Sequence, residues 1–450
     1  MRILFLTQHF MPHFEGGTES VVRAAAEALV AAGHELLVVA GRDIEGVPAG
    51  DPAEREERTV GSLRVVHLAP RAADAAQPLN DRLMLERPTL LAALLEEVRA
   101  FGPDLVHLHH QATLAMGLVP ALEARGLPAV VSLHDLFATC PRFFRVPPAA
   151  LVERLGLECP SRAEADGAPD LTPCIECIAD EAVGVPRGVL ADAFRSRRRN
   201  FALELDAARL LLAPSGSHAR RLERELDRPS GSIGVVENGL VAGLPRLAAP
   251  PELQPGDALE LVYLGHRARV KGLAELATAA AGAAAHSPRP LRLVCHGSGL
   301  EPDLEAELVA LGEYGAPGFT IELRGPYERA DLPRLCVGAH LAVFPSRAPE
   351  SYGLVVDEAL ALGLPVLCAE SGALAERLPT SNGGAGLSLP APLPADRDGG
   401  ASIARWAEEL GRIAEVPGIL AGWRAAIPDR IPGPDDLARR LVELYTPLLP

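Results

Sequence analysis

The stretch "LPRLAAPPELQPGD", Leu244–Asp257, divides the sequence into two halves of similar pattern. Four prolines lie within it, and proline can neither continue a helix nor donate to a strand ladder. On each side, short apolar runs alternate with segments of helical periodicity. The stretch therefore predicts a linker between two α/β domains.

The first half predicts a parallel, doubly wound sheet. Residue 33, a glycine, is expected to end the first helix. Strand and helix in alternation are typical of parallel sheets with helices on both faces. The expected strands are 2–7, 35–41, 105–110 and 129–134, and the expected helices are 19–33 and 89–102.

The same pattern starts again after the linker and predicts a second parallel α/β domain. A helix over 273–286 follows its first strand, and a last helix covers 435–449. The expected strands are 259–265, 291–297, 319–325, 339–346 and 364–370.

Four segments follow from this organisation. The N-terminal Rossmann-like domain is expected at residues 1–246, with a cysteine-containing insertion at about 138–190. The linker is 247–257, the second Rossmann-like domain is 258–428, and 429–450 forms a helix that is expected to pack back on the first domain. Ligands bind at the carboxyl ends of strands in such sheets, so two facing sheets predict an interdomain cleft.

Composition limits the partners. The chain has 450 residues, 48% of them hydrophobic, and a formal net charge of −16. Nucleic acids and anionic membranes demand basic surfaces, so neither is expected as a general partner. No stretch approaches the length of a transmembrane helix, and seven cysteines without a secretion signal predict a cytoplasmic location.

The stretch "APESYGLVVDEALALGLPV", Ala348–Val366, places two acids around the start of an expected helix. A helix start offers backbone N–H groups and a partial positive charge, which suit a phosphate, and Gly353 would permit close approach. Glu350 precedes the helix, and Glu358 lies about one and a half turns into it. The alternative is a loop acid and a first-turn acid that complements the helix dipole.

This pattern, with the motifs around it, resembles family-4 retaining glycosyltransferases of the GT-B fold. Glu-x7-Glu encloses an aromatic-Gly-Leu-Val insert and leads into "EALALGLPVLC". The other matching motifs, in chain order, are "GGTES", "SLHDLFATCPR", "VVENGL", "YLGHRARVKG" and "ELRGPYERADLPRLCVGAHLAVFPS". The resemblance covers nearly the whole chain and implies that the first domain lies on the acceptor side and that the second binds the nucleotide-sugar donor.

The resemblance implies roles for the helix-start residues. Glu350 would contact hydroxyls of the donor sugar or stabilise charge at the reacting carbon. Glu358 would accept hydrogen bonds from the nucleotide ribose. The backbone of Tyr352, Gly353 and Leu354 would hold the diphosphate.

Lys271 is the single lysine among 43 basic residues. It matches the family's phosphate-contact position, where a cation would stabilise the charge of a leaving nucleoside diphosphate. An ammonium does so as a point charge, without the geometry of a planar guanidinium. The alternative is a lysine that survives by chance.

One motif departs from the family pattern. The family has arginine directly after the glycine that matches Gly265, whereas this chain has His266 there and Arg267 one place later. We expect Arg267 to supply the second phosphate-binding cation, and His266 is the alternative.

Three residues of the first domain complete the expected site. The resemblance places Gly16 and Gly17 close to the donor phosphates and the acceptor, and an ordinary tight turn is the alternative. Gly-Gly lacks G-x-G-x-x-G spacing, which argues against a dinucleotide oxidoreductase. His134 is matched by a family histidine near the donor sugar and is a candidate catalytic residue; His109 and His110 have weaker support.

The insertion contains Cys140, Cys159, Cys174 and Cys177, the last two as C-x-x-C. Four thiolates would form a tetrahedral structural zinc site, and reduced, partly buried thiols are the alternative. The "DRD" of 396–398 is interpreted as a solvated loop, and the "RSRRR" of 195–199 as a solvated helix face. Contact of that face with an anionic acceptor or membrane surface stays open.

The sequence thus predicts a retaining glycosyltransferase. It would move a sugar from a UDP- or GDP-sugar to a hydroxyl of a glycan, a lipid-linked or a small-molecule acceptor, with no required cofactor, and Arg324–Tyr327 would lie by the base. A nucleotide-sugar epimerase of the same fold, or a non-catalytic nucleotide-sugar-binding protein, are the alternatives. Product analysis with donor alone separates the glycosyltransferase from the epimerase, because only the epimerase converts the donor without an acceptor.

Overall fold

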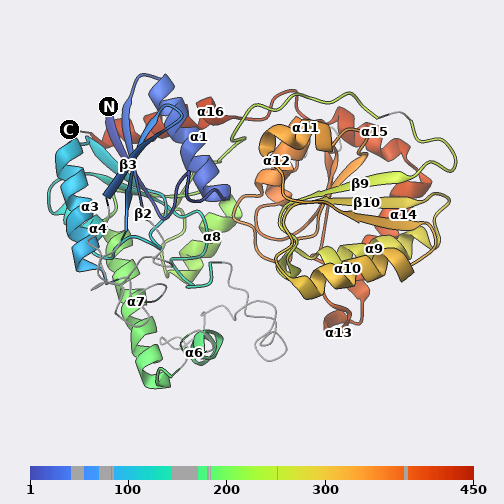
Figure 1. The fold of residues 1–450 in the computed structure, drawn as a ribbon, viewed down its shortest axis with the longest axis horizontal. Helices are drawn as coiled ribbons and strands as arrows, with labels where there is room; N and C mark the ends of the chain where they lie inside the picture. The colour runs from blue at the N-terminus through green and yellow to red at the C-terminus, as the bar shows by residue number, and fades with distance from the viewer. Residues whose placement is uncertain are drawn as a thin grey trace. The chain divides into compact units, whose positions relative to one another are not determined.

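The computed structural model describes residues 1–41, 55–69, 83, 86–143, 171–179, 182, 184–250, 252–379 and 384–449. The chain forms two compact units, coloured mainly blue to green and yellow to red in Figure 1. Met1–Val241 and Gly433–Pro450 make up the N-terminal unit, and Ala242–Pro432 the C-terminal unit.

The sheet of the N-terminal unit has the order β3-β4-β2-β1-β5-β6-β7-β8. Its central strands are apolar and almost entirely buried, as the sequence predicts for a doubly wound parallel sheet. The strands are β1 (Arg2–Thr7), β2 (Glu35–Gly41), β3 (Arg55–Val60), β4 (Leu63–Leu68), β5 (Leu105–Leu108), β6 (Ala129–Ser132), β7 (Leu210–Ala213) and β8 (Gly234–Val235).

Both edges of this sheet lie outside the strands expected from the sequence: β3 and β4 at one edge, and β7 and β8 at the other. β3 and β4 form a hairpin, and β3 runs antiparallel to β4. The turn is tight because Gly61 has a φ of +59°. β3, "REERTV", is polar and mostly exposed, so it lacks the apolar run by which a buried strand is predicted.

The helices of the N-terminal unit are α1 (Gly17–Ala31), α3 (Pro88–Phe101), α4 (Leu118–Glu123), α6 (Thr172–Ala179), α7 (Arg187–Ala207), α8 (Gly216–Glu225) and α16 (Pro434–Tyr445). The short helix η6 (Thr446–Leu448) follows α16. α16 packs against α1, although almost the whole chain separates them (Figure 1). Its Tyr445 side chain is completely buried, so the end of the chain is part of this unit's core.

The C-terminal unit has a parallel sheet of order β11-β10-β9-β12-β13-β14. The strands expected from the sequence all form. They are β9 (Leu259–Leu264), β10 (Leu291–His296), β11 (Phe319–Leu323), β12 (Leu341–Phe344) and β13 (Val366–Ala369), and β14 (Gly386–Leu389) adds an edge.

An alanine-rich helix and a tryptophan form much of this unit's core. α9 packs on α14, where the Trp406 ring is fully buried and its Nε1–H donates to the Pro390 carbonyl at 2.8 Å. The helices are α9 (Leu273–Ala284), α10 (Pro302–Tyr314), α11 (Leu332–Leu335), α12 (Leu354–Ala361), α13 (Ala395–Asp398), α14 (Ala401–Glu415) and α15 (Gly418–Ala425). Three short helices, η2 (Arg269–Lys271), η3 (Arg329–Asp331) and η4 (Ala375–Arg377), complete the unit.

Two expectations for polar segments are corrected here. The "DRD" of 396–398 is not an irregular loop: it lies in α13, and the Asp398 carboxylate accepts the backbone N–H groups of Gly400 and Ser402 at 2.9 and 2.8 Å. The "RSRRR" of α7 is not wholly solvated either. Arg197 is buried, stacks on Phe137 and Phe201, and donates to backbone carbonyls, so only its neighbours form an exposed basic face.

The proline-rich stretch behaves differently from a free linker. The Leu247 N–H donates to the Leu362 carbonyl at 3.0 Å, and the Arg246 guanidinium donates to the carbonyls of Arg424 and Pro428. Leu244 and Leu247 pack against the apolar core beside α12. These leucines give the stretch an apolar face, and the described part of it therefore lies on the C-terminal unit.

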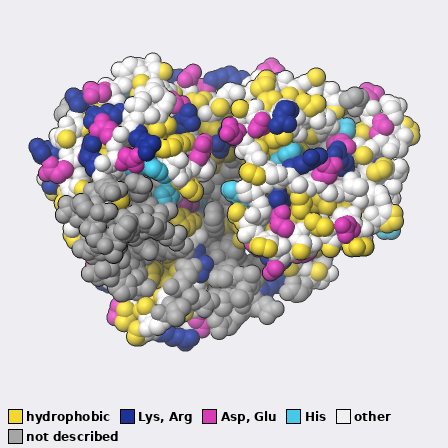
Figure 2. Space-filling view, in the orientation of Figure 1, with side chains coloured by type: hydrophobic (Ala, Val, Ile, Leu, Met, Phe, Trp, Pro, Cys, Tyr) yellow, Lys and Arg dark blue, Asp and Glu magenta, His cyan; other side chains and the backbone are white. Residues whose placement is uncertain are grey.

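Acidic and basic side chains are interspersed on the face shown in Figure 2. Among the described residues, no helix has both the length and the apolar character that a membrane span requires.

Candidate functional site

The strand order of the C-terminal unit brings two distant loops together. β9 is the first strand of its sheet, and β10 and β12 lie on either side of it. The order reverses there, and ligands of open α/β sheets bind outside the carboxyl ends of the strands at such a point. The loops that follow β9 and β12 are therefore neighbours, and the Val270 carbonyl accepts the N–H groups of Arg347 and Ala348 at 2.9 and 3.0 Å.

Gly272 permits this close approach. Its φ is +71°, and a Cβ atom on it would lie 2.2 Å from the Pro345 carbonyl oxygen. Any other residue would meet both a strained backbone and a clash. The glycine of the "VKG" motif thus sets the distance between Lys271 and the loop after β12.

Lys271 and Glu350 form an ion pair in this neighbourhood. The Lys271 Nζ lies 2.5 Å from the Glu350 Oε1, which also accepts the Ser346 hydroxyl at 2.8 Å. Both side chains are partly exposed, at 26% and 20%. The Glu350 backbone is held as well, because its carbonyl accepts the Ala373 N–H at 2.8 Å. The site therefore holds a fixed carboxylate and a cation that a ligand can reach.

The helix start between the two acids has the geometry that an anion requires. Gly353 is the N-cap of α12 with a φ of +90°, and a Cβ on it would lie 2.6 Å from the Leu374 Cδ2. Leu354 is the first residue of the helix. The N–H groups of a first helical turn have no partner within the helix, so they can donate to a phosphate.

Two residues that the sequence did not reveal support this helix start. The Asp357 carboxylate, 1% exposed, accepts the Tyr352 hydroxyl at 2.6 Å and the Arg377 Nε at 3.0 Å. The Arg377 guanidinium also lies over the Tyr352 ring, 4.5 Å from its centre. The Tyr352 side chain therefore points into the protein and fixes the backbone that it belongs to. Asp357 adjoins Glu358 in the sequence, which was the available clue.

Glu358 is buried and paired. Its Oε1 accepts the Arg329 Nε at 2.9 Å. Burial raises the pKa of its carboxyl group, and Arg329 opposes that effect. Arg329 comes from η3 and was also not recognised as a candidate. A ribose that binds Glu358 would have to share this carboxylate with Arg329.

The structure corrects the expectation for Arg267. The guanidinium is buried, makes two bonds to the Glu305 carboxylate at 2.7 and 2.8 Å, and donates to the carbonyls of Gly297 and Arg324. A guanidinium so committed to protein groups serves to hold the loops after β9, β10 and β11 together. His266 remains accessible to solvent, and partial desolvation of its ring, together with the charge of Lys271, lowers its pKa. His266 is thus better placed than Arg267 to meet a phosphate.

A pocket of about 630 Å³ lies on one face of the C-terminal sheet. Side chains at every second position of β9 and β10 line it, including Glu260, Arg292 and His296, together with the Arg324–Tyr327 segment. The Nε2 atom of His296 is buried without a hydrogen-bond partner among the described residues. The segment expected beside the base therefore borders a polar cavity.

Histidines gather at the carboxyl ends of the neighbouring strands β5 and β6. The Nδ1 of His109 lies 3.1 Å from the Nε2 of His134, so one of these two nitrogens donates to the other. The Ala112 N–H donates to the His110 Nδ1, which fixes the proton on Nε2, and that nitrogen donates to Asp135 at 3.0 Å. The predicted His134 and the more weakly supported His109 and His110 thus belong to one network.

Burial keeps part of this network neutral. Burial and the neighbouring His110 lower the pKa of His134 from 6.5 to about 4, and burial lowers that of His218 to about 4. Below pH 6.5 the unfolded chain would bind protons that the folded chain does not. Stability contributed by these histidines is therefore present above pH 6.5 and is lost as the pH falls towards 4.

We expect the unfolding temperature of the N-terminal unit to decrease as the pH is lowered from about 7 to about 5. His134→Asn removes one titrating group and should make this dependence shallower, whereas His286→Asn, at an exposed position of the other unit, should not. Calorimetric scans of the three proteins at a series of pH values measure the effect. Equal slopes for wild type and His134→Asn would contradict it.

Gly16 and Gly17 begin α1. Gly16 is the N-cap, its N–H donates to the Glu19 carboxylate at 3.1 Å, and a Cβ on it would lie 2.8 Å from that carboxylate. Glu19 is buried, which raises its pKa. A side chain at position 16 would collide with the Glu19 carboxylate, which explains why a glycine stands there. The helix start can accept an anion at Gly17.

The cysteine site stays a prediction. Cys159 lies outside the described residues. Among the described residues, Cys140, Cys174 and Cys177 do not form a group of three ligands close enough to share a metal ion.

Sequence comparison identifies the family of the chain. The sequence profile "Glycosyltransferase Family 4" matches residues 15–242, and "Family 4 Glycosyltransferase in conflict systems" matches residues 207–418. A D-inositol 3-phosphate glycosyltransferase of Thermobispora bispora is 28% identical over 379 residues, which cover 80% of this chain and 75% of that protein. A protein of the same name from Nocardioides sp. is 31% identical over 227 residues, and this match spans 47% of either chain.

Structural comparison supports the fold. HepE from Anabaena, solved in complex with UDP and glucose, superimposes with a TM-score of 0.59 at 17% identity and covers 99% of this chain and 100% of its own. The two parallel-sheet α/β units therefore match the GT-B architecture expected from the sequence.

Proposed function

Since the chain belongs to glycosyltransferase family 4 and is a glycosyltransferase, we propose that it transfers a sugar from a nucleotide diphosphate-sugar to an acceptor hydroxyl with retention at the anomeric carbon. The observation that carries this proposal is the pairing of Lys271 with Glu350 beside the start of α12. It combines a cation, a carboxylate and backbone donors where an open α/β sheet binds its ligands.

The proposed chemistry divides between the two members of the pair. As the bond between the sugar and the diphosphate breaks, negative charge grows on the leaving group, and Lys271 and the first N–H groups of α12 stabilise it. Glu350 binds donor hydroxyls or stabilises the positive charge at the reacting carbon. The leaving phosphate then accepts the acceptor's proton on the same face of the sugar, which accounts for retention.

The remaining residues would bind the nucleotide. Glu358 accepts hydrogen bonds from the ribose, and Arg329 favours the charged form of this carboxylate against the effect of burial. The base lies by Arg324–Tyr327, at the pocket that His296 also lines. In the N-terminal unit, His134 stays a predicted catalytic residue: at pH 7 its neutral imidazole can exchange a hydrogen bond with a sugar hydroxyl. A cytoplasmic location likewise stays a prediction from composition.

A donor and acceptor screen tests the proposed activity. The purified protein is incubated with UDP-, GDP- and ADP-sugars, each with and without an acceptor, and products are separated by mass and configuration. The names of the two curated relatives make D-inositol 3-phosphate the first acceptor to test. We expect an α-linked product from an α-linked donor. Conversion of the donor without acceptor would show an epimerase, and binding without turnover would support the non-catalytic alternative.

Glu358→Ala should weaken nucleoside diphosphate binding about 10–100-fold, because hydrogen bonds to a charged group are worth about 1.5–3 kcal/mol. Titration calorimetry measures the affinity. Glu313→Ala, at an exposed position of α10, is the control and should bind normally. A dideoxyribose nucleotide should bind wild type and Glu358→Ala equally weakly. If the variant still distinguishes ribose from dideoxyribose, Glu358 is not the ribose acceptor.

A further inference from the structure

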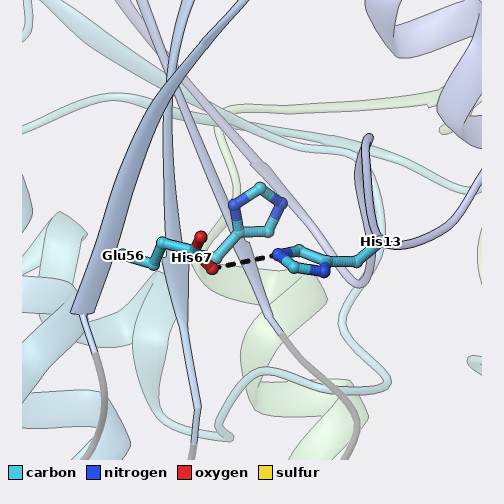
Figure 3. Close-up of side chains that lie close together, drawn as sticks. All are labelled: His13, Glu56 and His67. Atoms are coloured by element: carbon cyan, nitrogen blue, oxygen red, sulfur yellow. Dashed lines mark hydrogen bonds and ion pairs between the residues drawn. The ribbon is translucent and has the colours of Figure 1, made fainter.

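Three side chains of the N-terminal unit, none of them among the expected glycosyltransferase site residues, lie close together (Figure 3). Glu56 and His67 are directly paired across the β3–β4 hairpin, and His13 lies in the loop between β1 and α1. One ligand atom of each lies within 4.8 Å of the other two. Among the described residues, this is the one group of three or more such side chains that meets this criterion.

The geometry points to a divalent metal site, and we propose that His13, Glu56 and His67 bind one Zn²⁺ ion. Two imidazoles and one carboxylate are a ligand set that zinc accepts, with a fourth position left for water. The His13 Nε2 and the Glu56 Oε2 are 3.0 Å apart. Two ligands of a tetrahedral zinc ion, each at about 2.0–2.1 Å, are separated by about 3.3 Å, so little movement is needed at this pair.

The protonation of His67 suits a metal ligand. Its Nε2 lies 3.3 Å from the Phe10 carbonyl, which can only accept, so Nε2 carries the proton. The lone pair of the neutral ring is then on Nδ1. A ligating histidine that donates its other N–H to a backbone carbonyl is the usual arrangement at metal sites, and it fixes the orientation of the ring.

The surroundings supply both rigidity and access. The His67 side chain is fully buried, whereas those of His13 and Glu56 are 33% and 24% exposed. The rings of His13 and His67 meet edge to face with centroids 4.7 Å apart. The second oxygen of Glu56 accepts the Arg58 Nε, which holds the carboxylate in place. An ion can therefore enter from solvent and meet a ligand already fixed in the core.

The ion would join the loop between β1 and α1 to the edge of the sheet. Phe10 and His13 belong to this loop, which ends at Gly16. The bound metal would replace a single contact between His13 and Glu56 by a three-way link, and the loop that leads into α1 would lose freedom. The proposed role is structural and does not involve the transfer reaction.

Metal binding is tested on the full chain with Co²⁺ as a spectroscopic probe and Zn²⁺ as a competitor. We expect one Co²⁺ per chain at this site, with visible d–d bands that Zn²⁺ removes. The bands should lack thiolate-to-cobalt charge transfer, which would mark a cysteine site instead. His13→Ala and Glu56→Gln alter accessible ligands and should each weaken binding by at least about tenfold. His286→Ala, at an exposed position of the other unit, should bind as wild type does.

Hydrogen exchange provides a second readout. Zn²⁺ should slow amide exchange over residues 8–16 in the wild type and in His286→Ala, but not in His13→Ala. Unchanged Co²⁺ affinity in both His13→Ala and Glu56→Gln would overturn the proposal, as would spectra that show thiolate ligands alone. Neither result depends on glycosyltransferase activity.

Discussion

Replacement of Lys271 by alanine should lower kcat about 10²–10³-fold and change the KM of the donor little. The reason is that the bound diphosphate already carries negative charge, and additional negative charge develops on its leaving oxygen as the bond to the sugar breaks, so the attraction to the ammonium strengthens in the transition state. An interaction that strengthens in the transition state appears in kcat, and the loss of one preorganised donor of this kind typically costs about 10²–10³-fold. Initial rates over a range of donor concentrations separate the two constants.

Arg269→Ala is the matched control for this experiment. Arg269 lies two residues away in η2 and pairs with Glu301 and Glu307, not with Glu350. Its loss should leave kcat within about threefold, because the charges of exposed ion pairs are largely screened. Lys271→Arg should recover part of the rate, since it keeps the charge and changes its geometry. Equal rates for Lys271→Ala and Arg269→Ala would remove Lys271 from the proposed site.

Asp357→Ala should lower the free energy of unfolding of the C-terminal unit by about 3–5 kcal/mol. The substitution removes the partner of Arg377, a guanidinium 9% exposed, and such an uncompensated buried charge typically costs this much. For a unit of this size, each kcal/mol lowers the unfolding temperature by about 2–4 °C. Calorimetry should therefore show the unfolding transition of the C-terminal unit at a clearly lower temperature and that of the N-terminal unit unchanged.

Two variants separate the contributions to this effect. Tyr352→Phe removes only the hydroxyl bond to Asp357 and should cost about 0.5–1.5 kcal/mol. Asp331→Ala breaks a comparable but exposed pair with Arg334 and should cost less than about 1 kcal/mol. If Asp357→Ala is no worse than Asp331→Ala, the buried network does not hold the start of α12.

The general plan of the chain could be predicted because it depends on local patterns. "RILFLT" and "LELVYL" are apolar throughout, which indicates strands buried on both faces. Both form interior strands of their sheets, as expected. β3 escaped prediction because a polar edge strand is stabilised by pairing with β4 and not by burial of its own side chains.

The candidate site was predicted only in part. Motif resemblance identified Glu350, Glu358 and Lys271, but it could not show that Asp357, Arg377 and Arg329 hold this region in place. Arg267 was expected to bind phosphate because it stands near the family's arginine in the sequence. The Arg267 side chain is oriented instead by its ion pair with Glu305, an acid on another element that the sequence does not place beside it.

The sequence by itself determined two α/β domains, their main strands and helices, and the residue types of the proposed nucleotide-sugar site, because hydrophobic periodicity and glycine positions act over short distances. The tertiary structure alone decided which of those residues meet. Lys271 and Glu350 are 79 positions apart and touch because β9 lies beside β12. Strand order follows from how whole layers bury their apolar faces, and no local segment encodes it.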